Sequence, residues 1–98
     1  KQQTYGYTKD VLDLEPFTDK WKSFGFKVAE VNGHDIKQLQ DVLKSLPLDT
    51  TKPATIICHT IKGKGVSFVE ENLEWHHKTK ISEEEIRHLM ETLENSHA

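Results

Sequence analysis

The chain has a single cysteine, no long apolar run and no large excess of charge of either sign. Cys58 stands alone among 98 residues, so an intrachain disulfide is excluded. It lies in the apolar run ATIIC, where we expect a buried and chemically inert thiol. A protein with this cysteine usage fits a reducing, cytoplasmic setting. No run approaches the roughly 20 apolar residues that a membrane-spanning helix needs, so we expect no membrane partner.

The charge balance argues against a nucleic-acid partner. The net charge is -3, with 30% charged and 35% hydrophobic residues, whereas nucleic-acid binding proteins carry a basic patch. Ninety-eight residues suffice for one small domain and are too few for two. The modest apolar content predicts that the chain needs a partner surface for stability. Because it begins at Lys1 rather than at methionine, we expect it to be a piece of a longer protein.

Aromatic spacing predicts a helix after an irregular lead-in over residues 1–12. Three aromatic residues fall on one helical face at i, i+4 and i+7: Phe17, Trp21 and Phe24. Gly25 is placed to end this helix. A short strand over 26–31 follows, and an Asn-Gly pair predicts a turn after it.

A second helix and a second strand come next. Asp35 and Gln38 have the spacing of a capping box, and the helix that they begin carries an apolar stripe of Ile36, Leu39, Leu43 and Leu46. The strand over 54–59 is almost continuously apolar, which is typical of a parallel sheet covered on both faces.

The last element is a helix that begins at Ser82 and ends near Asn95. Ser82 and Glu85 form a second capping-box pattern. The resulting order of helix, strand, helix, strand, loop and helix predicts an α/β fold with a parallel sheet. Two strands are too few for a free-standing sheet of this kind, which again indicates missing sequence.

The loop Lys62-Gly63-Lys64-Gly65, here called the basic glycine loop, directly follows the second strand. Glycine lets the backbone approach a ligand closely, and lysine supplies positive charge for phosphate oxygens. The loop matches neither a Walker A sequence nor a dinucleotide fingerprint. Taken alone, it fits a solvated turn as well as a phosphate site.

The six histidines do not form a recognisable metal motif. No pair has the spacing of a His-Glu-x-x-His zinc site, and one cysteine cannot build a thiolate cluster. His76 differs from the others because it follows Trp75 in the loop beyond the second strand, where open α/β sheets place their ligands. It could donate a hydrogen bond to a phosphate and move protons near neutral pH, or serve only in packing.

Taken together, these segments resemble the back half of the diphosphate-binding domain of transketolases, especially the type split into two subunits. LEPFTDKWKSFGF with VAEVNGHD resembles the family's helix–strand–turn segment, and HTIKGKGVSFVEENLEWHHK resembles its Lys-Gly-x-Gly and Trp-His-Gly motifs. The resemblance implies that residues 1–98 are the C-terminal segment of a thiamine diphosphate-binding domain with a partial parallel-sheet fold.

The resemblance also implies a set of site residues. Lys62 matches a lysine near the cofactor diphosphate, and His76 matches the histidine that contacts the diphosphate and acts in catalysis. The backbone carbonyl of Gln2 matches one metal ligand, for Mg²⁺ or alternatively Ca²⁺. The family's Gly-Asp-Gly motif is absent here, and its metal-binding Asn would immediately precede Lys1. We therefore expect Lys62 and His76 to converge on one diphosphate group.

One residue departs from the family pattern. The family has glycine after the Trp-His pair, whereas this chain has His77. A side chain there could alter the path of the loop or add a second imidazole to the site, which leaves the substrate preference open.

In the family, the glutamate that activates the cofactor comes from a pyrimidine-binding domain, usually on another polypeptide. The resemblance thus implies a cytoplasmic hetero-oligomer of this chain, the remaining N-terminal part of its domain and a pyrimidine-binding subunit. Together they would transfer a two-carbon ketol unit between sugar phosphates. Three alternatives remain: a component of a deoxyxylulose-phosphate synthase-like enzyme, a stand-alone phosphate-binding module, or a non-catalytic assembly subunit.

Overall fold

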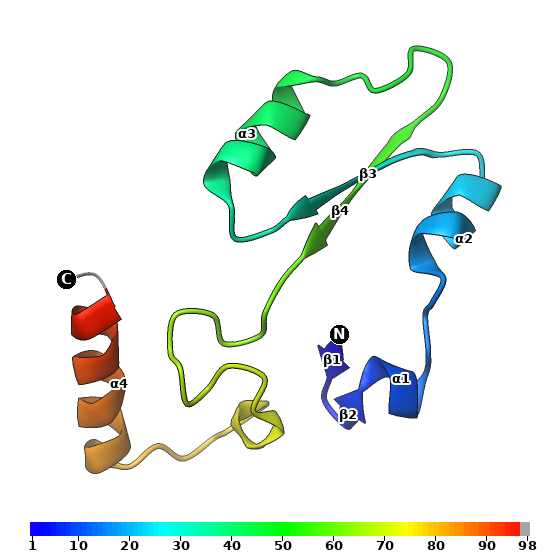
Figure 1. Ribbon diagram of the computed structural model, residues 1–98. Helices are drawn as coiled ribbons and strands as arrows, with labels where there is room; N and C mark the ends of the chain where they lie inside the picture. The colour runs from blue at the N-terminus through cyan, green and yellow to red at the C-terminus, as the bar shows by residue number, and fades with distance from the viewer. Residues whose placement is uncertain (97–98) are drawn as a thin grey trace. The chain divides into compact units, whose positions relative to one another are not determined.

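The computed structural model describes residues 1–96, which divide into two compact units. Unit 1 contains residues 1–11 with 61–96, and unit 2 contains residues 12–60. Figure 1 follows the elements along the chain. Unit 2 is a small α/β unit, and unit 1 combines a short hairpin, a long loop and a C-terminal helix. None of the helices within residues 1–96 has the length and apolarity that crossing a bilayer requires.

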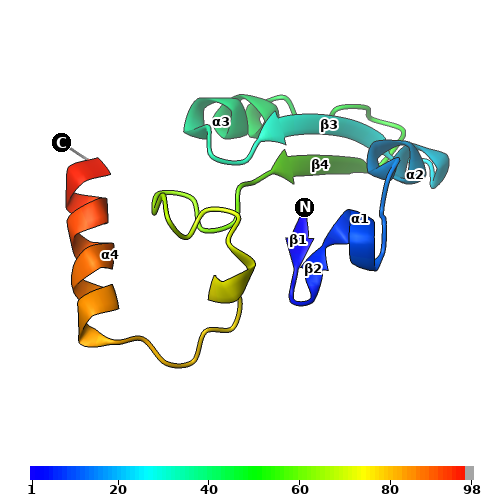
Figure 2. The same cartoon turned by 60° about the horizontal axis from the view of Figure 1, so that its bottom comes forward.

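Unit 2 is built around a two-stranded parallel sheet. Strands β3 (Lys27–Asn32) and β4 (Ala54–His59) lie side by side in Figures 1 and 2, and helix α3 (Ile36–Lys44) connects them. Their register pairs Lys27 with Ala54 at one end and Asn32 with His59 at the other. This arrangement confirms the predicted α/β fold with a parallel sheet.

The connection into α3 follows from its sequence. The Asp35 carboxylate accepts a hydrogen bond from the Gln38 amide at 3.0 Å, which satisfies one free donor at the helix start. The Gln38 side chain accepts from the backbone N–H of Asn32 at 3.0 Å and so ties the helix to the end of β3. Gly33 is required in the turn because a Cβ there would lie 2.7 Å from Cγ2 of Thr60.

Helix α2 (Phe17–Ser23) confirms the predicted first helix, which ends before Gly25 in the left-handed region at φ +89°. Trp21 stacks edge-on against Phe17 and against Phe26, with ring centroids 6.1 and 5.0 Å apart. Phe24 directly follows the last helical residue and is 79% exposed, and it lies on the same side as Phe17 and Trp21, as predicted.

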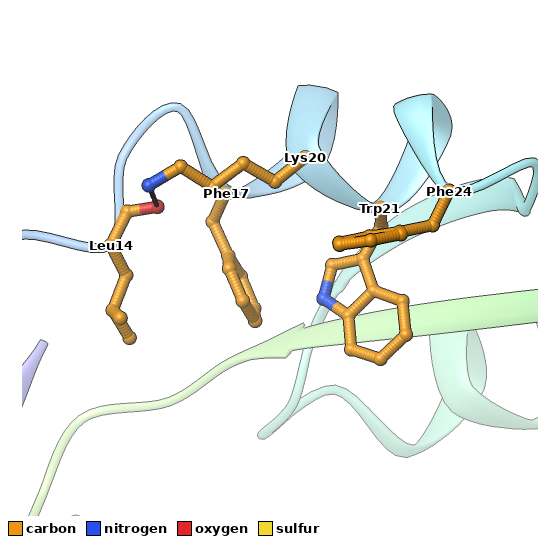
Figure 3. A pocket seen from close by; sticks show the side chains of 5 residues that line it. All are labelled: Leu14, Phe17, Lys20, Trp21 and Phe24. Carbon is orange, nitrogen blue, oxygen red and sulfur yellow. Dashed lines mark hydrogen bonds between the residues drawn. The ribbon is translucent and has the colours of Figure 1, made fainter.

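An open apolar cavity of about 210 Å³ lies along α2. Figure 3 shows its lining, in which the Lys20 ammonium turns back to donate to the Leu14 carbonyl at 2.9 Å. The cavity is lined by Leu14, Phe17, Lys20, Trp21 and Phe24. It carries no carboxylate or imidazole, and its one titratable group, the Lys20 ammonium, is hydrogen-bonded to a backbone carbonyl.

Glu30 joins three elements of unit 2. Its carboxylate accepts a hydrogen bond from the Thr18 hydroxyl of α2 at 2.7 Å and contacts Nε2 of His59 on β4, also at 2.7 Å. The Thr18 hydrogen bond, followed by the one with His59, lowers the pKa of Glu30 below its ordinary value. This exposed cluster holds α2 against the sheet.

The sheet and helices of the described residues leave their apolar faces uncovered. No hydrophobic side chain within residues 1–96 is fully buried, and Ile36 on α3 is 67% exposed. The prediction of a buried thiol is wrong, because Cys58 is exposed. A parallel strand is buried only when helices cover both faces of the sheet, and here the helices pack mainly against β3.

The N-terminal part of unit 1 is more regular than the sequence predicts. Residues 1–12 are not an irregular lead-in, because strands β1 (Gln2–Gln3) and β2 (Gly6–Tyr7) form an antiparallel hairpin. Helix α1 (Thr8–Val11) follows, and its Thr8 amide donates to the Lys1 carbonyl at 3.0 Å.

The remainder of unit 1 agrees with the prediction of a long loop and a final helix. The loop contains one short 3₁₀ turn, η1 (Leu73–Trp75), and leads to helix α4 (Glu83–Ser96). Both halves of the predicted capping box are present. The Ser82 hydroxyl accepts from the Glu85 amide at 3.2 Å, and the Glu85 carboxylate accepts from the Ser82 amide at 2.8 Å.

Candidate functional site

The basic glycine loop has a backbone path that two glycines make possible. Gly63 and Gly65 have φ values of +76° and +101°, in the left-handed range that glycine adopts without strain. A Cβ at Gly63 would also lie 2.8 Å from the backbone oxygen of Val69. The loop therefore folds back tightly on the segment that follows it. Gly63 is required both by its positive φ and by the lack of space for a Cβ.

Two hydrogen-bond donors of this loop, the Gly65 amide and the Lys64 ammonium, are already paired within the chain. The Glu70 carboxylate accepts a hydrogen bond from the Gly65 amide at 3.1 Å and forms an ion pair with Nζ of Lys64 at 3.5 Å. Lys62 differs from Lys64, because within residues 1–96 no ion pair engages its ammonium group. Of the two loop lysines, Lys62 is thus the one available to an outside anion.

Glu71 connects Lys62 to the N-terminal hairpin through backbone atoms. Its amide donates to the Lys62 carbonyl at 3.0 Å, and its own carbonyl accepts from Nε2 of Gln2 at 2.6 Å. Glu71 has a φ of 56°, in the left-handed region. These two hydrogen bonds hold the basic loop and the hairpin together within unit 1.

The hairpin leaves the Gln2 backbone carbonyl unused. Paired residues in an antiparallel ladder alternate between hydrogen-bonded and non-hydrogen-bonded pairs. Lys1 accepts from Thr8, so the next pair, Gln2 with Tyr7, is the non-bonded one. The Gln2 carbonyl oxygen therefore points away from β2. The side-chain Oε1 of Gln2 is also buried, and it has no hydrogen-bond partner among the described residues.

His76 lies half-buried in the same unit, directly after η1. Its Nε2 lies 2.8 Å from the hydroxyl oxygen of Thr4, at the tip of the hairpin. Its Nδ1 is buried and finds no hydrogen-bond partner within residues 1–96. A buried polar atom without a partner costs free energy, so this nitrogen is well suited to meet a group that the chain itself does not supply.

His77 occupies the position where the family motif has glycine, and it preserves the glycine-like backbone. Its φ is 57°, in the left-handed region, where histidine is one of the better tolerated residues after glycine. The exposed imidazole of His77 packs edge-on against His76, with ring centroids 4.5 Å apart. His77 thus adds a second imidazole beside His76, and its backbone is in the left-handed conformation that glycine readily adopts.

Lys78 fixes the segment that carries His76. Its ammonium lies 4.2 Å from the ring centroid of Trp75 and also pairs with the Glu85 carboxylate at the start of α4. The Lys78 hydrogen bond, followed by that from the Ser82 amide, lowers the pKa of Glu85 to about 2. The segment is therefore anchored at two points: Thr4 contacts the imidazole of His76, and Glu85 of α4 pairs with Lys78.

Removing the Lys78 ammonium is expected to raise the pKa of Glu85. A depressed carboxyl pKa contributes stability that is complete above the ordinary value of 4.5 and is lost as the pH falls towards about 2. In Lys78→Met the titration of the Glu85 side-chain carboxyl carbon, followed by NMR, should move towards 4.5. Acid unfolding of α4 should then begin at a higher pH. An unchanged titration would show that Lys78 does not stabilise the carboxylate.

All three residues that the sequence predicts for the site lie in unit 1: Gln2, Lys62 and His76. The sequence places Thr4 near the predicted metal ligand but does not indicate the contacts through which Thr4, Glu70 and Glu71 support these residues. No cluster of three or more His, Cys, Asp or Glu side chains fit to hold a metal occurs within the described part of the chain. The predicted metal contact is a backbone carbonyl, so this finding does not bear on it.

Comparison with known proteins identifies the family. Residues 4–97 match the family described as transketolase, thiamine diphosphate binding domain. The chain belongs to this family, and the partial α/β architecture of unit 2 is consistent with it.

Several curated relatives are named as transketolase subunits. The chain is 43% identical over 84 residues to an apulose-4-phosphate transketolase subunit of Actinobacillus succinogenes, and 37% identical over 95 residues to its namesake in Phocaeicola vulgatus. It is 39% identical over 84 residues to 6-deoxy-6-sulfo-D-fructose transketolase subunit SqwG of a Clostridium species. These alignments cover 86%, 94% and 86% of the chain but only 30%, 34% and 30% of the relatives. The chain thus spans about a third of their length.

Proposed function

We propose that the chain is the C-terminal segment of the diphosphate-binding subunit of a transketolase that moves a two-carbon ketol unit from a ketose phosphate to an aldose. The observation that carries this proposal is the buried Nδ1 of His76, which has no hydrogen-bond partner within residues 1–96. The same unit holds Lys62, for which those residues provide no ion pair. Family membership supports it independently.

The residues present fit a diphosphate group. Thiamine diphosphate, when bound, supplies the carbon nucleophile and the electron sink that ketol transfer needs. Lys62 would neutralise diphosphate charge from the basic loop, where Glu70 already satisfies Lys64 and leaves Lys62 available. His76 would present Nδ1 to the diphosphate, and through this same nitrogen it would exchange a proton with an oxygen of the reacting sugar that reaches it.

Gln2 would complete the shell of a cation, Mg²⁺ or alternatively Ca²⁺, through its backbone carbonyl. A carbonyl oxygen that points away from its ladder partner is a suitable ligand for either hard cation. The other protein ligands would come from other parts of the assembled enzyme.

The chain would act only within an assembly. Its exposed apolar faces, which include Ile36 and Met90, need covering, and the rest of the same domain would cover part of them. A pyrimidine-binding subunit would supply the remaining catalytic groups. The relatives are likewise named as subunits of transketolases. We place this hetero-oligomer in the cytoplasm.

Ketol transfer by the assembled enzyme tests this function. Ketol transfer from a panel of donors should disappear when thiamine diphosphate is removed or when EDTA strips the divalent cation. Adding both back should restore it. The panel contains ketose phosphates, apulose 4-phosphate among them, and the ketose sulfonate 6-deoxy-6-sulfofructose. Ketol transfer that persists without thiamine diphosphate would contradict the proposal, and so would a failure to transfer from any donor in the fully reconstituted enzyme.

A further inference from the structure

We infer that Thr4 is a positioning residue that holds His76 in the tautomer with its proton on Nδ1, ready to donate to an anionic oxygen. This inference rests on the proposed function, because it assigns the group that prepares His76 for the diphosphate. The observation behind it is the contact of 2.8 Å between the Thr4 hydroxyl oxygen and Nε2 of His76, across 72 positions of sequence.

The argument starts from the proton count of the imidazole. A neutral histidine carries one N–H, so one ring nitrogen donates and the other accepts. If Nε2 carried the proton and donated to Thr4, then Nδ1 would be a buried acceptor. A diphosphate oxygen is itself an acceptor, and the two could not pair.

The opposite arrangement suits an anion. Threonine has a hydroxyl that donates as readily as it accepts. When the Thr4 O–H donates to Nε2, the proton of His76 lies on Nδ1, the buried atom that has no partner within residues 1–96. The imidazole then presents an N–H donor to the site without having to be charged. A histidine is oriented in the same way in metal sites, where the partner of one ring nitrogen sets the state of the other.

The hairpin makes Thr4 a fixed partner. Thr4 lies in the two-residue turn between Gln3 and Gly6, which pair across the hairpin. The amide of Thr8 closes the other end by donating to Lys1, and the Gln2 side chain ties the hairpin to Glu71 at 2.6 Å. The backbone that carries the Thr4 side chain is therefore held in place by contacts that do not involve His76.

The test compares Thr4→Val, which removes the hydroxyl and keeps the shape, with Thr4→Ser, which keeps the hydroxyl. The first readout is ¹⁵N NMR of the cofactor-free assembled enzyme at about pH 8, above the ordinary imidazole pKa of about 6.5. His76 is identified by difference from His76→Gln. We expect the Nδ1–H pattern in the wild type and in Thr4→Ser, and a loss of that pattern in Thr4→Val.

The second readout is the affinity of the same variants for thiamine diphosphate. Thr4→Val should weaken binding about tenfold, the effect of misdirecting one hydrogen bond to a charged group, while Thr4→Ser stays within about twofold. If the NMR spectrum of the wild type shows the proton on Nε2, or protons on both ring nitrogens, the proposed role of Thr4 is wrong. This holds whether or not His76 contacts the diphosphate. If the Nδ1–H tautomer is present but His76→Ala binds thiamine diphosphate as tightly as the wild type, the proposed contact with the diphosphate is wrong instead.

Discussion

Thiamine diphosphate is expected to bind about 10- to 100-fold more weakly after Lys62→Met. Methionine keeps most of the apolar stem and removes the ammonium, so the change isolates the charge. Within residues 1–96 no carboxylate pairs with Lys62, and its loss therefore frees no internal partner. The measurement is the dissociation constant of thiamine diphosphate for the assembled enzyme, by calorimetry or by the fluorescence of Trp75.

The same loop provides a matched control. Lys64 lies two positions further on and is paired with Glu70 at 3.5 Å, so Lys64→Met should change cofactor affinity by less than about twofold. Equal losses in the two variants would mean that the loop acts only through its overall charge. An unchanged affinity in Lys62→Met would remove Lys62 from the site.

Replacing His76 by alanine is expected to lower kcat/KM for ketol transfer by about 100-fold or more, because it removes both a diphosphate contact and a group that moves protons. His76→Gln separates these two roles. Its amide can still donate a hydrogen bond but cannot exchange a proton, so cofactor affinity should recover more than turnover does.

The neighbouring imidazole serves as the control for His76. Asparagine tolerates the left-handed backbone that His77 adopts at φ 57°. His77→Asn should therefore keep the loop in place and retain turnover within a few fold. If turnover is unchanged in His76→Ala, the chain serves assembly rather than catalysis. If His77→Asn lowers turnover more than His76→Ala does, the catalytic role belongs to His77 rather than His76.

The parts of the fold that the sequence predicted well depend on local chemistry. Asp35 and Ser82 each cap a helix through contacts with residues three positions away, and the apolar strand over 54–59 was recognisable from its composition. Such features need no knowledge of distant contacts. The candidate site residues, in contrast, came from the family resemblance, because the motifs around Lys62 and His76 are each ambiguous by themselves.

The features that the sequence did not reveal depend on contacts that local sequence patterns do not indicate, several of them between residues far apart in the chain. The β1–β2 hairpin is too short to be stable alone. Its contacts with Glu71 and His76 join residues 69 and 72 positions apart in the chain. The exposure of Cys58 depends on which helices cover the sheet, and in the described residues the helices pack mainly against β3 rather than β4. Nothing in the local sequence indicates that the tight turn of the basic glycine loop brings the Glu70 carboxylate to the Gly65 amide at 3.1 Å.

A crystal structure of the assembled enzyme with thiamine diphosphate bound tests the central claim most directly. The account predicts that Lys62 Nζ and His76 Nδ1 both lie at charge-assisted hydrogen-bond distance, about 2.7–2.9 Å, from oxygens of one diphosphate group. Either side chain directed away from the diphosphate, with another residue in its place, would contradict the account.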